Sequence, residues 1–149
     1  MNYQEKSREL FRQGYNCSQA VFGAFADKMN IDKDIAFKIS GPLGGGLARR
    51  REMCGAVIGM LMVYGFFHGN AIAENQEEKA RVYNESRALI REFERIWGTC
   101  YCNKLMGVEE DLDSVVTVGA RTFEYYASRP CEKCVMSAAK IVEEMVING

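Results

Sequence analysis

The sequence predicts an all-α protein: one compact helical bundle, formed by residues 1–149, around a central buried helix. Three observations support this fold class. Apolar residues recur at helical spacing, glycines and capping residues bound these segments, and alternating strands are missing apart from one short β-branched run. A chain of 149 residues, 48% of them hydrophobic, fits a single domain with a substantial core. The net charge of −1 gives no electrostatic reason to expect a nucleic acid as partner.

Three helices are expected in the first 40 residues. The amphipathic pattern of residues 2–13 ends at Gly14. Asn16 is a suitable N-cap for a second helix over residues 17–28, and Asp32 for a third that ends near residue 39. The glycine-rich loop SGPLGGGLARRR follows this third helix.

The central helix is expected to start in the stretch EMCGAVIGM, residues 52–60, and to end at Gly69. It is apolar on all faces, which indicates that other helices surround it. Its uncharged run, residues 53–67, is shorter than the roughly 18 residues of a membrane span, so no membrane insertion is expected. Gly55 and Gly59 lie one turn apart and allow close approach of a second helix or of a cofactor, and helix packing is the simpler explanation.

Four segments complete the predicted fold. Residues 74–97 form a long amphipathic helix with Tyr83 at one of its apolar positions, and Thr99 can cap a short helix that ends near residue 105. Residues 115–118 are a weak strand candidate. Pro130 suits the first turn of a last helix, which extends to about residue 146.

All six cysteines fall in or near the first turn of a predicted helix: Cys17, Cys54, Cys100, Cys102, Cys131 and Cys134. A helix N-terminus carries unpaired N–H groups and a partial positive charge, which stabilise a thiolate or an anionic metal–sulfur centre. The N-terminal residues lack the pattern of a secretory signal, so a cytoplasmic location is expected. There, a set of cysteines indicates metal binding, catalysis or redox sensing, although any one of them can simply fill space in the core.

Four segments that contain these cysteines resemble the small redox-active proteins labelled C_GCAxxG_C_C: GYNCSQAVFGAF, GPLGGGLARRREMCGAVIGMLMVYGF, GTCYCNKLMG and RPCEKCVMSAAKIVEEM. The resemblance covers nearly the whole chain. By position it implies that the family's four cysteines are Cys17, Cys54, Cys102 and Cys131, with Cys100 and Cys134 as additions. The family is also similar to the non-haem part of split-Soret cytochrome c, which implies a cysteine-bound iron–sulfur centre.

Three hypotheses follow for the chemistry of the cysteines. The favoured one is an iron–sulfur cluster for electron transfer or redox sensing, with four thiolate ligands: Cys17, Cys54, Cys102 and Cys131. The second is a metal-free thiol–disulfide protein that uses the CxxC motif at residues 131–134. The third is a structural zinc site in two cysteine pairs: Cys100 with Cys102, and Cys131 with Cys134.

Cys54 and Cys131 are the candidate catalytic thiols, and Gly55 and Gly59 are candidates for the contact with a cofactor. The sequence does not separate an oxidoreductase from an electron carrier, and it names no redox partner. A homodimer is one way in which a small chain can cover much apolar helix surface, and the sequence does not establish the oligomeric state.

Three further features bear on cofactors and ligands. Val135 stands where a CxxCH motif needs histidine, which excludes a c-type haem. The only histidine, His68, is expected to cap the central helix or to lie at an interface rather than to bind a metal. Arginines 49–51 either bind an anion at the start of the central helix or form a solvated, flexible turn.

Overall fold

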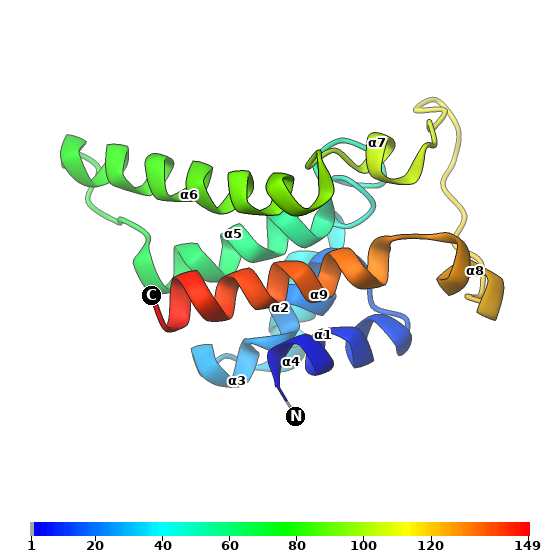
Figure 1. Cartoon of the computed structure of the whole chain (residues 1–149), viewed down its shortest axis with the longest axis horizontal. Coiled ribbons are helices and arrows are strands. Elements are labelled where there is room, and N and C mark those ends of the chain that lie inside the picture. The colour runs from blue at the N-terminus through cyan, green and yellow to red at the C-terminus, as the bar shows by residue number, and fades with distance from the viewer. Residues whose placement is uncertain (1) are drawn as a thin grey trace.

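The helices begin largely where their capping residues predict. The computed structural model describes residues 2–149 and confirms an all-α fold (Figure 1). Asn16 accepts a hydrogen bond from the Gln19 backbone N–H at 3.0 Å, and the Gln19 side chain accepts one from Asn16 in return. Asp32 caps its helix in the same way, through the Ile35 N–H. The helices are α1 (Tyr3–Arg12), α2 (Cys17–Ala24), α3 (Ala26–Met29), α4 (Lys33–Ser40), α5 (Gly55–His68), α6 (Gln76–Trp97), α7 (Cys102–Met106), α8 (Phe123–Ser128) and α9 (Cys131–Ile141).

Several predicted boundaries are wrong. The second helix ends at Ala24, and a separate short helix, α3, follows it. Residues 115–118 form no strand and lie in an exposed loop, while α8 occupies a segment that the pattern did not predict. Tyr83 is 70% exposed rather than packed, because only Leu89 and Phe93 of α6 are buried.

The short helix after α6 also starts later than predicted. Thr99 does not cap it: the Thr99 hydroxyl accepts from the Tyr101 N–H, and α7 begins at Cys102 with Tyr101 at the N-cap. Cys100 therefore lies before α7 rather than in its first turn, and its carbonyl accepts a 2.7 Å hydrogen bond from the Cys54 N–H. This contact and a single β-bridge between Met53 and Tyr101 attach the segment to the start of α5.

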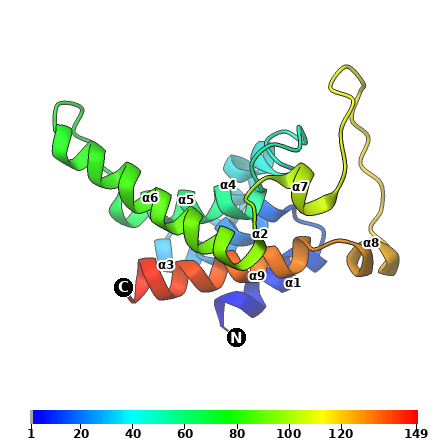
Figure 2. The ribbon, with the colours of Figure 1, turned by 45° about the horizontal axis from the view of Figure 1, so that its top comes forward.

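Helix α5 is central, and α2, α6 and α9 pack against it. In Figure 1, α5 and α9 both start on the right and run to the left, whereas α6 runs the opposite way. The last helix continues beyond Ile141 as a π-helical segment, Val142–Ile147. Figure 2 shows that the first part of α6 extends beyond the other helices. The N-termini of α5 and α9 thus meet at one end of the bundle, together with α7.

Two glycines bring α5 and α2 into backbone contact. A Cβ atom on Gly59 would lie 2.9 Å from the Ser18 carbonyl oxygen and 3.0 Å from Val21 Cβ. A Cβ atom on Gly55 would lie 3.1 Å from the Ser18 nitrogen and 3.2 Å from Cys17 Cβ. The close approach therefore supports helix packing as the reason for both glycines, and it sets the first residue of α2 beside the first turn of α5.

Within residues 2–149, no helix is both long enough and apolar enough to cross a membrane.

Candidate functional site

A cavity of about 930 Å³ lies at the end of the bundle where α5 and α9 begin. Five cysteines line it, and we call it the cysteine cavity: Cys17, Cys54, Cys102, Cys131 and Cys134. Cys100 is buried but does not line the cavity. The four cysteines that the family resemblance implies are thus gathered in one place, together with one of the two additional cysteines.

Four of these thiols form two interacting pairs, each of which joins different helices. The Cys17 thiol at the start of α2 interacts with the Cys131 thiol at the start of α9, and this hydrogen-bonding interaction shifts their two pKa values in opposite directions. The Cys134 thiol, one turn further along α9, interacts in the same way with the Cys54 thiol at the N-cap of α5. The cysteines of the CxxC motif therefore each pair with a cysteine of another helix.

Cys54 and Cys134 form the inner pair, and their pKa values are shifted in opposite directions. The hydrogen bond from Cys134 and the backbone N–H groups of Ala56 and Val57 lower the pKa of Cys54, against the effect of its burial. The same hydrogen bond, together with burial, raises the pKa of Cys134. Cys54 is therefore the more acidic thiol of the pair, because it faces the unpaired N–H groups at the start of α5.

Cys17 and Cys131 form the outer pair, and their pKa values are also shifted in opposite directions. The hydrogen bond from Cys17 lowers the pKa of Cys131 to about 7, although burial opposes it. The positive charges of Arg129, Arg51 and Arg121 contribute in the same direction. The pKa of Cys17 is raised, first by its hydrogen bond to Cys131 and then by burial. A thiolate at Cys131 is the nucleophilic form of a cysteine, so this residue can attack at neutral pH.

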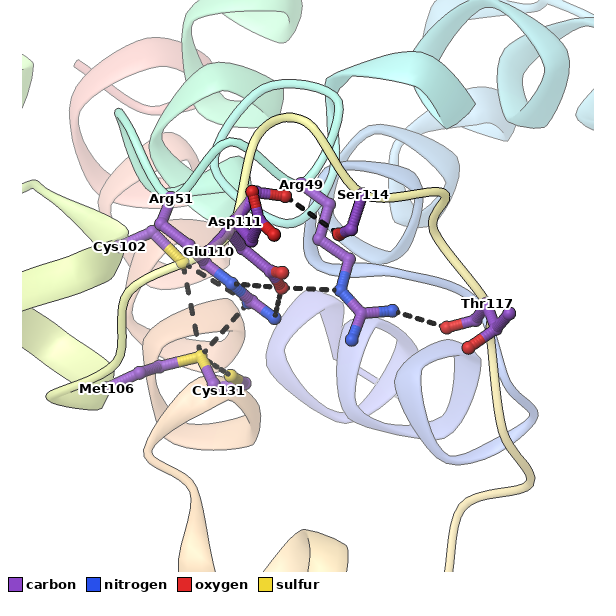
Figure 3. A network of polar contacts seen from close by, with 9 residues as sticks. All are labelled: Arg49, Arg51, Cys102, Met106, Glu110, Asp111, Ser114, Thr117 and Cys131. Atoms are coloured by element: carbon purple, nitrogen blue, oxygen red, sulfur yellow. Dashed lines mark hydrogen bonds and ion pairs between the residues drawn. The ribbon is translucent and has the colours of Figure 1, made fainter.

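Cys102 and Cys131 both contact one methionine, Met106 (Figure 3). The Met106 sulfur lies 4.0 Å from Cys102 Sγ and 3.6 Å from Cys131 Sγ. A guanidinium nitrogen of Arg51 lies 3.7 Å from Cys102 Sγ. Burial raises the pKa of Cys102, and Arg51 opposes this shift.

The glycine-rich loop turns tightly through several left-handed residues. Gly45 and Gly46 have φ values of +67° and +76°, and the next three residues, 47–49, are left-handed as well. Hydrogen bonds across the loop hold this conformation, among them Arg51 N–H to the Gly45 carbonyl at 3.1 Å and Glu52 N–H to the Gly46 carbonyl at 2.8 Å. A Cβ atom on Gly46 would lie 2.7 Å from Cys102 Cβ. The loop thus packs directly on α7 and positions Arg51 beside the thiols.

The loop arginines are paired with carboxylates. Figure 3 shows Glu110 between Arg49 and Arg51, and one Glu110 carboxylate oxygen accepts from both at 2.9 and 3.0 Å. Arg49 also donates to the Thr117 carbonyl at 2.8 Å. Arg50 is exposed and pairs with Glu52. These contacts attach the segment between α7 and α8 to the rim of the cysteine cavity.

Sequence patterns missed several residues at this site, namely Met106, Glu110, Arg121 and Arg129. They have no motif of their own, and only the tertiary arrangement brings them to the cysteines. His68 is not part of the cysteine cavity: its Nε2 lies 3.1 Å from the Val146 carbonyl oxygen at the other end of α5.

The site geometry also bears on metal binding. Among residues 2–149, no three His, Cys, Asp or Glu side chains are grouped closely enough to hold a single metal ion. The thiols of Cys17, Cys54, Cys131 and Cys134 nevertheless lie close enough to shift one another's pKa values.

Comparison with known proteins gives one match, to a family model. No curated protein and no solved structure matches the chain significantly. A family model described as "Putative redox-active protein (C_GCAxxG_C_C)" matches residues 15–145, a range that includes all six cysteines and the glycine-rich loop. The chain therefore belongs to the C_GCAxxG_C_C family of redox-active proteins.

Proposed function

We propose that this chain is a thiol–disulfide redox protein whose redox group is the pair of dithiols in the cysteine cavity. One observation carries the proposal: four cysteines from different helices line one cavity as two interacting pairs, and in each pair the pKa of one thiol is lowered and that of the other is raised. Such a pair combines a nucleophile with a resolving thiol, as disulfide exchange requires.

The outer pair is the one that reacts with a substrate. Cys17 is partly exposed, whereas the other five cysteines are buried, and its partner Cys131 is the acidic thiol. The Cys131 thiolate attacks one sulfur of a disulfide, RSSR, to form a mixed disulfide and release RS⁻. Cys17 then transfers its proton to a leaving thiolate and attacks Cys131, which forms the Cys17–Cys131 disulfide and releases the second RS⁻. Two electrons pass from the protein to RSSR, which becomes one thiol, protonated by Cys17, and one thiolate that takes its proton from water.

The inner pair serves as a second dithiol. Cys54 and Cys134 are both buried, so a substrate reaches them less easily than it reaches the outer pair. Cys134 lies one helical turn from Cys131, and exchange between the two can pass the oxidation inward.

An iron–sulfur centre is the second candidate, and the pairing of the thiols favours it too. A two-iron cluster takes two protein ligands on each iron, and Cys17 with Cys131 and Cys54 with Cys134 provide two such pairs. This set has Cys134 in place of Cys102 of the predicted ligand set. The helix N-termini and Arg51 would offset the negative charge of a thiolate-bound cluster. When bound, such a centre supplies one-electron transfer.

The experiment is an anaerobic preparation assayed for iron, sulfide, zinc, visible absorption and free thiols. The dithiol proposal expects a metal-free protein that loses four thiols on treatment with diamide and regains them with a reductant. Cys54→Ser should then lose only two, and Cys100→Ser, the matched control, should still lose four. Stoichiometric iron and sulfide with a visible band that Cys54→Ser abolishes would replace the dithiol proposal with the second candidate.

A further inference from the structure

The charge of the cysteine cavity differs sharply from that of the whole chain. Five arginines line it: Arg12, Arg49, Arg51, Arg121 and Arg129. Within residues 2–149, no aspartate or glutamate lines it, although the chain as a whole has a net charge of −1. A cavity bordered by one sign of charge attracts ligands of the opposite sign.

Ion pairs offset only part of this charge. Glu132 pairs with Arg12, and Glu110 is shared between Arg49 and Arg51. Two carboxylates thus offset two of the five guanidinium charges, and three remain. The Cys131 thiolate accounts for one of these, which leaves positive charge for an incoming anion.

The uncompensated arginines lie beside the outer thiol pair. Arg129 directly precedes Pro130 and Cys131, and its guanidinium carbon lies 4.1 Å from the centre of the Tyr125 ring. Within the described range Arg129 makes no hydrogen bond or ion pair. Arg121 lies 5.2 Å from the same ring centre and donates to the Phe11 and Tyr15 carbonyls rather than to a carboxylate. Tyr125 thus packs against Arg129, the Phe11 and Tyr15 carbonyls hold Arg121, and both arginines line the cavity together with Cys131.

The volume of the cavity limits the size of the ligand. About 930 Å³ is at the upper end of the range for small-molecule sites, roughly 300–1,000 Å³. Such a space admits a low-molecular-weight disulfide that lies along the cavity with its sulfurs at Cys131.

We propose that the oxidant of the outer dithiol is a small anionic disulfide with carboxylate groups, and that Arg129, assisted by Arg121, binds a carboxylate of it. This inference rests on the proposed function and names the substrate class for it. The exchange steps are those given above, with the disulfide as electron acceptor and two carboxylate-bearing thiols as products. Arg129 is a binding residue in this scheme, and the cysteines are the reacting groups.

The test compares two disulfides of different charge. Reduced, metal-free protein is mixed anaerobically with 3,3′-dithiodipropionate, a dianion, or with neutral 2-hydroxyethyl disulfide. The rate of thiol loss is measured with each, and dithiothreitol serves as a reference for the intrinsic reactivity of the two compounds. After this correction, the wild-type protein should prefer the dianion by about tenfold at low ionic strength.

Two variants and a salt series identify the source of the preference. Arg129→Gln should lose most of it, and Arg129→Lys should retain it. Arg87 is an exposed arginine on α6 that does not line the cavity, so Arg87→Gln should leave the preference for the dianion unchanged. Added sodium chloride should reduce the preference of the wild-type protein.

The outcomes separate the two proposals. Equal corrected rates with both disulfides, or a preference that Arg129→Gln leaves intact, would overturn the anionic substrate and leave the dithiol function standing. If neither disulfide oxidises the folded protein, both the dithiol function and its substrate class are refuted.

Discussion

Replacing Gly59 by alanine tests the backbone contact on which the cysteine cavity is built. The added Cβ would lie 2.9 Å from the Ser18 carbonyl oxygen and 3.0 Å from Val21 Cβ, so the backbone of α2 would have to move. Overpacking of this kind costs about 1–3 kcal/mol. Alanine also favours the helix over glycine by about 1 kcal/mol, which offsets part of that cost. We therefore expect a net loss of roughly 1 kcal/mol in the free energy of unfolding.

Gly65→Ala is the matched control, because it lies in the same helix and its added Cβ would meet nothing within 4 Å. It should gain up to about 1 kcal/mol from helix propensity alone. The difference between the two variants isolates the packing cost, and about 2 kcal/mol corresponds to roughly 4–8 °C in Tm for a chain of this size. Urea denaturation followed by circular dichroism measures it. A Gly59→Ala protein as stable as Gly65→Ala would refute the close contact of α2 and α5.

Three further predictions concern the thiols and the backbone. The rate of iodoacetamide alkylation at Cys131, measured by peptide mass spectrometry, should rise with pH, with a midpoint near 7. The reason is that the lowered pKa of Cys131 makes the reactive thiolate the main form above that pH. Arg129→Gln should move this midpoint upward, and a wild-type midpoint near 9 would contradict the assignment. Ser18→Ala should raise the free energy of unfolding by about 1 kcal/mol, because the buried Ser18 hydroxyl has no hydrogen-bond partner within residues 2–149. Urea denaturation measures this change, and a loss of stability would show that the hydroxyl has a partner. Ala48→Gly should stabilise the protein by about 1 kcal/mol, because Ala48 has a left-handed φ of +49° that glycine adopts without strain. Ala80→Gly, on the exposed face of α6, should destabilise the protein by a similar amount, because glycine disfavours a helix. Equal changes in the free energy of unfolding for Ala48→Gly and Ala80→Gly would rule out strain in the loop.

The helices could be predicted because their signals are local. Asn16 and Asp32 cap the helices that follow them with their own side chains, and the central helix was recognisable from a long uncharged run. The break between α2 and α3 could not be predicted in this way. It falls at Phe25, which is fully buried and has its ring centre 4.3 Å from that of Tyr3. That contact joins residues far apart in the chain, so no local pattern reports it.

The candidate site was predictable in its members but not in its pairing. The position of cysteines at helix starts indicated that they gather, since the starts of several helices can meet at one end of a bundle. The CxxC motif suggested that Cys131 and Cys134 act together, whereas each interacts with a cysteine on another helix. Which thiols meet depends on how α2 and α5 pack against α9. The surrounding arginines were not predictable for the same reason.

The most direct test of the dithiol proposal is to map the disulfides of the oxidised protein. The reduced protein is titrated anaerobically with diamide, the remaining thiols are blocked, and the linked peptides are identified by mass spectrometry. The proposed function predicts Cys17 linked to Cys131 and Cys54 linked to Cys134, with Cys100 free. A disulfide that includes Cys100, or six thiols that remain reduced throughout the titration, would contradict it.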